Sequence, residues 1–237
     1  MADNILPYKG IWPKIDRGAF LAPNAYVIGD VEIGPETNIW FGCVVRGDMN
    51  VIRIGRRVNV QDATVIHVDS RKYGTFIGDD VTIGHSAIIH ACTLEDRSFI
   101  GMQACIMDGA VVESGAMVAA GGLITPGKVV KAGQLWAGKP ARFVRDCGDQ
   151  ERDMIAHVPP EYWKMAQRYL EAGIGRVDGY RPPANRVAIG AAAPGKKAAA
   201  APGKKAAAAP GKKAAAAPGA KGAAAPTAKG AKTGAKR

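Results

Sequence analysis

Large apolar residues recur at every sixth position between about residues 15 and 145, and glycine follows several of them. The nineteen positions are Leu21, Val27, Ile33, Ile39, Val45, Ile54, Val60, Ile66, Ile77, Ile83, Ile89, Leu94, Ile100, Ile106, Val112, Val118, Ile124, Val130 and Trp136. A short period over so many repeats indicates a solenoid whose units stack on one another. We predict an all-β parallel β-helix of triangular section, with three hexapeptides, about 18 residues, in each coil.

Two further segments follow the repeats. Residues 1–148 form the expected solenoid domain with its N-terminal lead-in. In residues 149–175 the apolar positions after Pro159 and Pro160 have helical spacing, which predicts a C-terminal α-helix packed on the solenoid. Residues 176–237 are a linker and a tail in which proline recurs every eighth residue from Pro194 to Pro226. Because this tail has few apolar residues larger than alanine, we predict that it is disordered.

The positive charge belongs to the tail. The chain has 237 residues and a net charge of +11, but residues 186–237 hold ten Lys and two Arg and no acidic residue. The remainder has 20 basic and 21 acidic residues, so the solenoid surface is close to neutral. A tail of this kind attracts phosphate without reading sequence. Non-specific binding to nucleic acid or another acidic surface and a merely solubilising role are equally compatible with it.

The location expected from the sequence is cytoplasmic. The first ten residues lack the basic and apolar regions of a secretory signal, and no segment approaches the length of a membrane span. The four cysteines form no CxxC pair or dense framework, so we expect reduced thiols that serve mainly as core residues.

The repeat lattice places two of the four histidines together. The step from Val45 to Ile54 has three extra residues and the step from Ile66 to Ile77 has five, and we expect both surpluses to form loops at corners. Val45, Ile66 and Ile89 then stack in one column. The residues that follow them, Arg46, His67 and His90, stack on the outer surface. Coils lie about 4.8 Å apart, so the two imidazoles can share a metal ion.

The third histidine belongs to a different side. Val60 and Ile83 form another column, and Asp62 and His85 lie two residues beyond them. His85 therefore lies around a corner from the other two histidines and can join them only if a second copy supplies it. Such a contact is heterologous and closes as a ring, and three-fold closure suits a triangular prism. We therefore predict a homotrimer, in which Arg46 faces Asp62 across the subunit boundary. His157 lies outside the lattice and is interpreted as structural.

Three histidines with an open position for water form the catalytic type of zinc site. Bound zinc lowers the pKa of its water to about 7 and so supplies metal-bound hydroxide at neutral pH. Attack of this hydroxide on CO₂ to give bicarbonate is its simplest use. Zn²⁺ is the expected cofactor, with Fe²⁺ or Co²⁺ as alternatives.

At these residues the chain resembles the γ-class carbonic anhydrase family, over about residues 10–170. The resemblance lies in RGDMN at 46–50, NVQDATVIH at 59–67, GHSAIIH at 84–90 and FIGMQA at 99–104. It implies a left-handed β-helix, with His67 and His90 from one subunit and His85 from the next as metal ligands. It also implies Gln61 as hydrogen-bond partner of the hydroxide, supported by Asn59 and Asp48, with Arg46 and Asp62 as the inter-subunit pair.

The chain departs from the best-characterised members of this family at the groups that transfer protons. Met49 occupies the place of one glutamate, and the loop 68–75 offers only Asp69 in place of a second acidic group. Tyr73, Tyr162 or buffer are the remaining proton routes, and activity is expected to be low if none is efficient.

Two other functions are compatible with the sequence. Many hexapeptide solenoids are acyltransferases, but those need one catalytic histidine rather than three with the spacing of metal ligands. A metal-binding trimer with weak or no catalysis is the other alternative, and the missing glutamates favour it.

Overall fold

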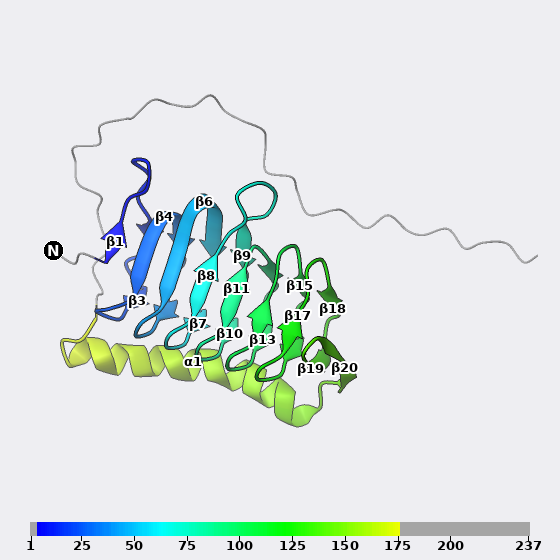
Figure 1. Cartoon of the computed structure of the whole chain (residues 1–237). Helices are drawn as coiled ribbons and strands as arrows, with labels where there is room; N and C mark the ends of the chain where they lie inside the picture. The colour runs from blue at the N-terminus through cyan, green and yellow to red at the C-terminus, as the bar shows by residue number, and fades with distance from the viewer. Residues whose placement is uncertain (1–3, 176–237) are drawn as a thin grey trace, which may run out of the picture. The chain divides into compact units, whose positions relative to one another are not determined.

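The computed structural model describes residues 4–175, which wind into a parallel β-solenoid with one long helix along its side (Figure 1). The predicted fold class is confirmed for this part of the chain. The prediction of a disordered tail falls on residues 176–237, outside the described residues. No helix within residues 4–175 is long and apolar enough to cross a membrane.

Short strands lie on three faces and pair in parallel with the strands of neighbouring coils, except that the last strand, β20, pairs antiparallel with β19. The first face contains β1 (Ile5–Leu6), β4 (Tyr26–Ile33), β6 (Val44–Ile54), β8 (Val65–His67), β11 (Ile88–His90), β14 (Cys105–Ile106) and β17 (Leu123–Ile124). The second contains β2 (Lys14–Ile15), β9 (Thr75–Ile77), β12 (Thr93–Leu94), β15 (Val111–Val112) and β18 (Val129–Val130), together with the later parts of β4 and β6. The third contains β3 (Phe20–Leu21), β5 (Asn38–Ile39), β7 (Asn59–Val60), β10 (Thr82–Ile83), β13 (Phe99–Ile100), β16 (Met117–Val118), β19 (Gln134–Gly138) and β20 (Ala141–Asp146).

The six-residue lattice forms the core. Ile66 pairs in register with Val45 on one side and Ile89 on the other, and Val60 pairs with Ile83, as the lattice predicted. All five side chains are fully buried. β-branched residues suit these columns because they fill a pleated, buried face. Strand pairing of neighbouring coils therefore brings outward-facing residues into rows as well.

The expected loop at the first lattice break is wrong. Its three surplus residues lie within β6, which continues around a corner beside β4 (Figure 1). The register between the two strands shifts there, because Gly29 pairs with Gly47 but Val31 pairs with Ile52. A Cβ on Gly29 would lie 2.4 Å from the Gly47 carbonyl oxygen, and a Cβ on Gly47 would lie 2.6 Å from that of Asp30. The two glycines therefore allow an approach that would exclude other side chains. The second surplus does form a loop, residues 68–74.

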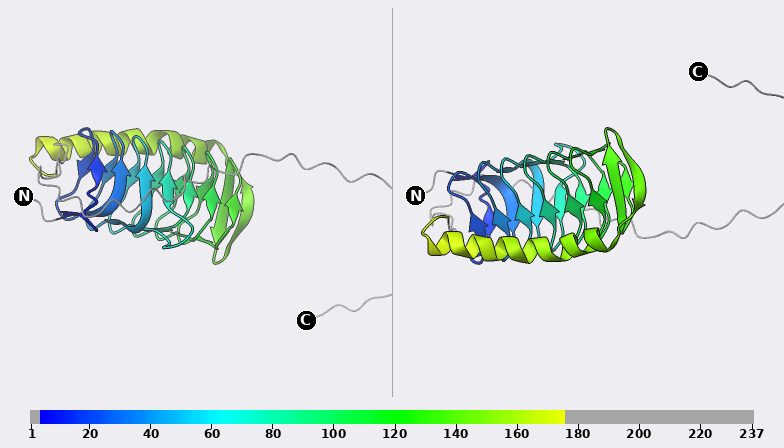
Figure 2. Two further views of the ribbon diagram at one scale, coloured as in Figure 1. Left: turned by 90° about the horizontal axis from the view of Figure 1, so that it is seen from above. Right: turned by 90° about the horizontal axis from the view of Figure 1, so that it is seen from below.

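The C-terminal helix α1 (Asp149–Glu171) runs along the third face (Figure 2). It begins well before the two prolines, which lie inside it. Ala166 of the helix is fully buried, and the Trp40 ring meets Tyr162 and Tyr169 edge to face, with ring centroids 5.6 and 5.3 Å apart. Such aromatic pairs stabilise beyond their buried area. The helix thus covers apolar surface that the third face would otherwise expose.

Candidate metal centre

Two histidines stand side by side on the first face, one coil apart. β8 and β11 pair in register, so His67 lies directly opposite His90, as predicted. Nδ1 of His67 is 3.3 Å from Nε2 of His90, and the ring centroids are 5.3 Å apart. We call these residues the His67/His90 pair. Both side chains are partly buried.

A carboxylate contacts a ring nitrogen of each histidine in the solenoid. Asp48 Oδ1 is 3.0 Å from Nε2 of His67, and Asp108 Oδ1 contacts Nδ1 of His90. Asp62 Oδ2 is 2.9 Å from Nδ1 of His85. A carboxylate on one nitrogen holds the proton there and leaves the other nitrogen with its lone pair, which is the usual arrangement around a ligating histidine.

Asp48 is the most enclosed of these carboxylates, with 14% of its side chain exposed. Burial alone raises the pKa of Asp48. Hydrogen bonds from His67 and from Nη1 of Arg46 outweigh this effect, so the net pKa lies below the ordinary value. The group is thus held as an anion between a cation and an imidazole. Arg46, which we expected to face Asp62, pairs with Asp48 within a single chain.

Gln61 lies in a buried chain of hydrogen bonds. Its Nε2 donates to Oδ1 of Asn59 over 3.0 Å, and Nδ2 of Asn59 donates to Oγ1 of Thr82 over 2.8 Å. Asn59 and Thr82 are partners in register on β7 and β10. The amide nitrogen can only donate, so the Gln61 carbonyl oxygen is the group of this side chain that can accept a hydrogen bond.

His85 lies at a corner between the third and first faces, in the turn between β10 and β11. Asp62 and His85 lie on successive coils there, and the Ser86 N–H donates to the Asp62 carbonyl. On the next coil, the Gln103 N–H donates to the His85 carbonyl. Within residues 4–175 of one chain, no three His, Cys, Asp or Glu side chains are grouped so as to hold a metal ion. The single chain thus places two of the candidate ligands on one face and the third at a corner.

An outward-facing row of apolar side chains runs along the first face beside these polar groups. Tyr26, Val65 and Ile88 are 44%, 39% and 47% exposed. The complete row, in register, is Tyr26, Val44, Val65, Ile88, Cys105 and Leu123, and we call it the apolar column. His67 and His90 stand two residues beyond its members on the same strands, so the pair lies at the margin of an uncovered apolar surface.

The loop 68–74 lies directly after His67, and its one carboxylate is used within the loop. Asp69 Oδ2 accepts the backbone N–H groups of Lys72 and Arg71 at 2.7 and 2.9 Å. These bonds lower the pKa of Asp69. A carboxylate of low pKa that caps its own loop is poorly suited to accept and release protons near neutral pH. Met49, at the neighbouring corner, is 57% exposed.

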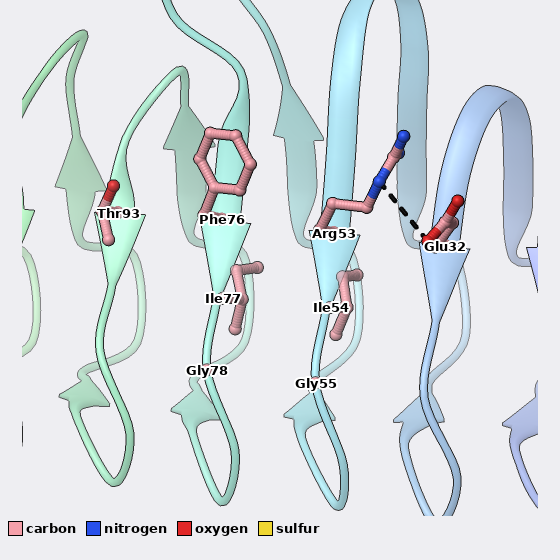
Figure 3. Close-up of a pocket in the computed structure, with 8 residues that line it drawn as sticks. All are labelled: Glu32, Arg53, Ile54, Gly55, Phe76, Ile77, Gly78 and Thr93. Atoms are coloured by element: carbon pink, nitrogen blue, oxygen red, sulfur yellow. Dashed lines mark ion pairs between the residues drawn. The ribbon is translucent and has the colours of Figure 1, made fainter. Parts of the chain in front are cut away.

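The depression drawn in Figure 3 lies elsewhere, on the second face. Glu32, Arg53, Phe76 and Thr93 line it, and Arg53 Nε lies 3.5 Å from Glu32 Oε2. No candidate metal ligand contributes to it.

The cysteines are also separate from the histidine chemistry: all four are free, and burial raises the pKa of Cys43 to about 12.

Sequence reasoning did not identify two polar partners, Asp108 and Thr82. Thr82 follows Asn59 by one coil on the lattice, so the stacking rule could have found it. Asp108 lies one coil beyond His90 but two residues after Ile106, in a turn. Its contact depends on how the turn directs the side chain, which the period does not report.

Comparisons with known proteins support the hexapeptide pattern. The family described as "Bacterial transferase hexapeptide (six repeats)" matches residues 13–47. A solved structure of a hexapeptide transferase family protein from Anaplasma phagocytophilum is 46% identical, with a TM-score of 0.69, and the match covers 71% of this chain and 99% of that chain.

Two curated relatives are similar in sequence. "Gamma carbonic anhydrase 1, mitochondrial" of Arabidopsis thaliana is 46% identical over 162 residues, covering 66% of this chain and 59% of the relative's length. The chain therefore spans less than two thirds of that plant protein. "Carbonic anhydrase" of Geobacillus kaustophilus (strain HTA426) is 43% identical over 165 residues, covering 70% of this chain and 90% of the relative.

Proposed function

Because the chain belongs to the γ-class carbonic anhydrase family, we propose that it catalyses the reversible hydration of CO₂ to bicarbonate at a zinc site that two subunits of a homotrimer share. His67 and His90 of one subunit and His85 of the next hold the metal. The observation that carries the proposal is the His67/His90 pair with a carboxylate on the far nitrogen of each ring.

The donor set fits a tetrahedral metal ion. With Zn–N distances near 2.0–2.1 Å, two ligands of a tetrahedral ion lie about 3.3–3.4 Å apart. The facing nitrogens of the pair are separated by 3.3 Å. When Asp48 and Asp108 hold the protons on the far nitrogens, two lone pairs face each other, which is repulsive unless a cation lies between them. Imidazole nitrogens suit Zn²⁺ and also Fe²⁺ or Co²⁺.

The protein's own groups position the reacting molecules. Zn²⁺, when bound, lowers the pKa of a water ligand to about 7. The Gln61 carbonyl accepts a hydrogen bond from the reacting oxygen and so directs the oxygen's lone pair to CO₂. Asn59 and Thr82 hold the Gln61 amide in the required orientation. Asp48 orients His67, and Asp62 orients His85.

The apolar column supports the trimer. Its three most exposed members are large side chains, and burying apolar area of this kind against a second copy drives association. The column borders the His67/His90 pair, so the same contact would bring a partner's corner to the metal ligands. Arg46, which binds Asp48 within its own subunit, would meet Asp62, which contacts His85, at this boundary.

A subunit-mixing experiment tests the shared site. Chains carrying His67→Ala and His85→Ala are unfolded together, refolded in equal amounts and loaded with zinc. In a closed ring, about one quarter of the interfaces should regain a complete site, in metal content and in CO₂ hydration. Mixing His67→Ala with His90→Ala is the matched control, because both losses fall on the same subunit and no interface is complete. Trimers without recovered metal in the first mixture, or recovery in the control, would refute the proposal.

A metal-binding trimer with little catalysis is the second candidate. Met49 and the self-capping of Asp69 favour it, because neither of these two positions within residues 4–175 supplies a carboxylate suited to accepting protons. Burial and the charge of Asp62 also raise the pKa of Tyr162, which makes it a poor substitute. Zinc bound in a one-to-one ratio without buffer-dependent CO₂ hydration would favour this candidate. The acyltransferase alternative is weaker.

We also propose that the basic tail binds nucleic acid without sequence preference, through the twelve Lys and Arg of residues 186–237. Such binding weakens steeply with salt because it depends on counterion release. An electrophoretic shift assay comparing the full chain with residues 1–185 tests this, and equal affinity of the two would refute it. The expected cytoplasmic location stays a prediction.

A further inference from the structure

The His67/His90 pair is one part of a longer row of polar groups along the solenoid. Asp48 contacts His67, His67 faces His90, and His90 contacts Asp108. Successive coils supply these side chains, so a carboxylate closes each end of the row. Asp48 also binds Arg46. The carboxylate at the other end has no assigned role.

The turn that carries Asp108 is held on both sides. The Asp108 carbonyl accepts the Gly127 N–H at 2.8 Å, and the Gly109 N–H donates to the Ala91 carbonyl at 2.7 Å. Gly109 has a φ of +66°, and a Cβ there would lie 2.9 Å from the Tyr73 ring. The turn therefore favours glycine, and its backbone bonds extend to both neighbouring coils. A carboxylate on such a turn is presented to His90 from a defined position.

The contact between Asp108 and His90 selects one tautomer of the imidazole. The carboxylate accepts a proton only from Nδ1, so Nε2 carries the lone pair. Nε2 is the atom that faces His67 across 3.3 Å. We propose that Asp108 is a positioning residue, which sets the tautomer and ring orientation of His90 for metal binding. This inference rests on the proposed metal site.

Removing such a carboxylate lowers metal affinity without removing a ligand. Loss of a partner of this kind typically costs about 10- to 100-fold in affinity. Asp108→Ala should show the full effect. Asp108→Asn retains an oxygen that can accept from Nδ1 and should lose less. Asp153→Asn is the matched control, because Asp153 Oδ1 lies 2.8 Å from Nδ1 of His157 on the exposed helix, away from the row.

The experiment measures the zinc affinity of the full chain by competition with a chromogenic chelator. The melting temperature of each apo-protein checks its fold, and size-exclusion chromatography checks its assembly. The expected order of affinity is wild type and Asp153→Asn first, then Asp108→Asn, then Asp108→Ala, with unchanged assembly. Equal affinity in all four would overturn the role of Asp108, whereas a wild type that binds no zinc would overturn the metal site itself.

A spectroscopic readout separates positioning from general stability. In the zinc-loaded wild type, proton NMR should give a downfield signal from the hydrogen-bonded Nδ1–H of His90. Asp108→Ala should lose this signal, even where its fold and zinc content at excess metal match the wild type. If Asp108→Ala folds poorly, the test rests on Asp108→Asn, whose signal should move to higher field. A wild-type signal in every folded variant would overturn the inference.

Discussion

The alternation of side chains on β9 makes a contrast between neighbouring residues testable. Ile77 is 4% exposed and belongs to the inward columns, whereas Phe76 is 42% exposed and lines the open depression on the second face (Figure 3). Ile77→Ala removes three carbons from the core, about 2.4 kcal/mol of transfer free energy at about 0.8 kcal/mol each. The cavity adds to this, so the expected loss of unfolding free energy is about 2–5 kcal/mol.

Phe76→Ala removes more atoms but should cost less. Because its side chain is only partly buried and its loss widens an open surface, the expected cost is about 1 kcal/mol. Urea denaturation, followed by far-UV circular dichroism at one protomer concentration, measures both. A Phe76→Ala protein that is destabilised as much as Ile77→Ala would refute the assignment of inward and outward faces.

Three further outcomes are expected. Hydrogen bonds from Arg145 and the Gly148 N–H hold the pKa of Glu151 at about 2, so the stability that the ionised carboxylate contributes is present above the ordinary pKa of 4.5 and is lost as pH falls toward 2. The melting temperatures of wild type and Glu151→Gln should therefore differ at pH 7 and converge in acid. Ile88→Asp places a charge in the apolar column and should yield folded monomers in sedimentation analysis, so intact trimers would contradict the interface. Asp69→Asn should leave CO₂ hydration unchanged while added imidazole buffer accelerates both proteins, and a large drop in the variant would identify Asp69 as the proton acceptor.

The sequence by itself determined the repeating coils of this protein. A six-residue period places one apolar side chain on each short side, and coil stacking follows from burying those side chains. The columns, the opposition of His67 and His90 and the different side of His85 could all be counted from it. A slip in register would expose a buried apolar column to water, which is unfavourable, so the period by itself sets the register in which neighbouring coils pair.

Only the tertiary structure decided how the remaining groups meet. The surplus residues before Ile54 stay in a strand because two glycines permit close contact at a corner, and α1 continues through Pro159 and Pro160. The carboxylate of Asp108 reaches His90 through the geometry of its turn and its side-chain rotamer, whereas Thr82 meets Asn59 in strand register. Backbone spacing is repeated from coil to coil, but the direction of a polar side chain depends on neighbours that are distant in sequence. The lattice could therefore locate the histidines, while the groups that orient them required the folded chain.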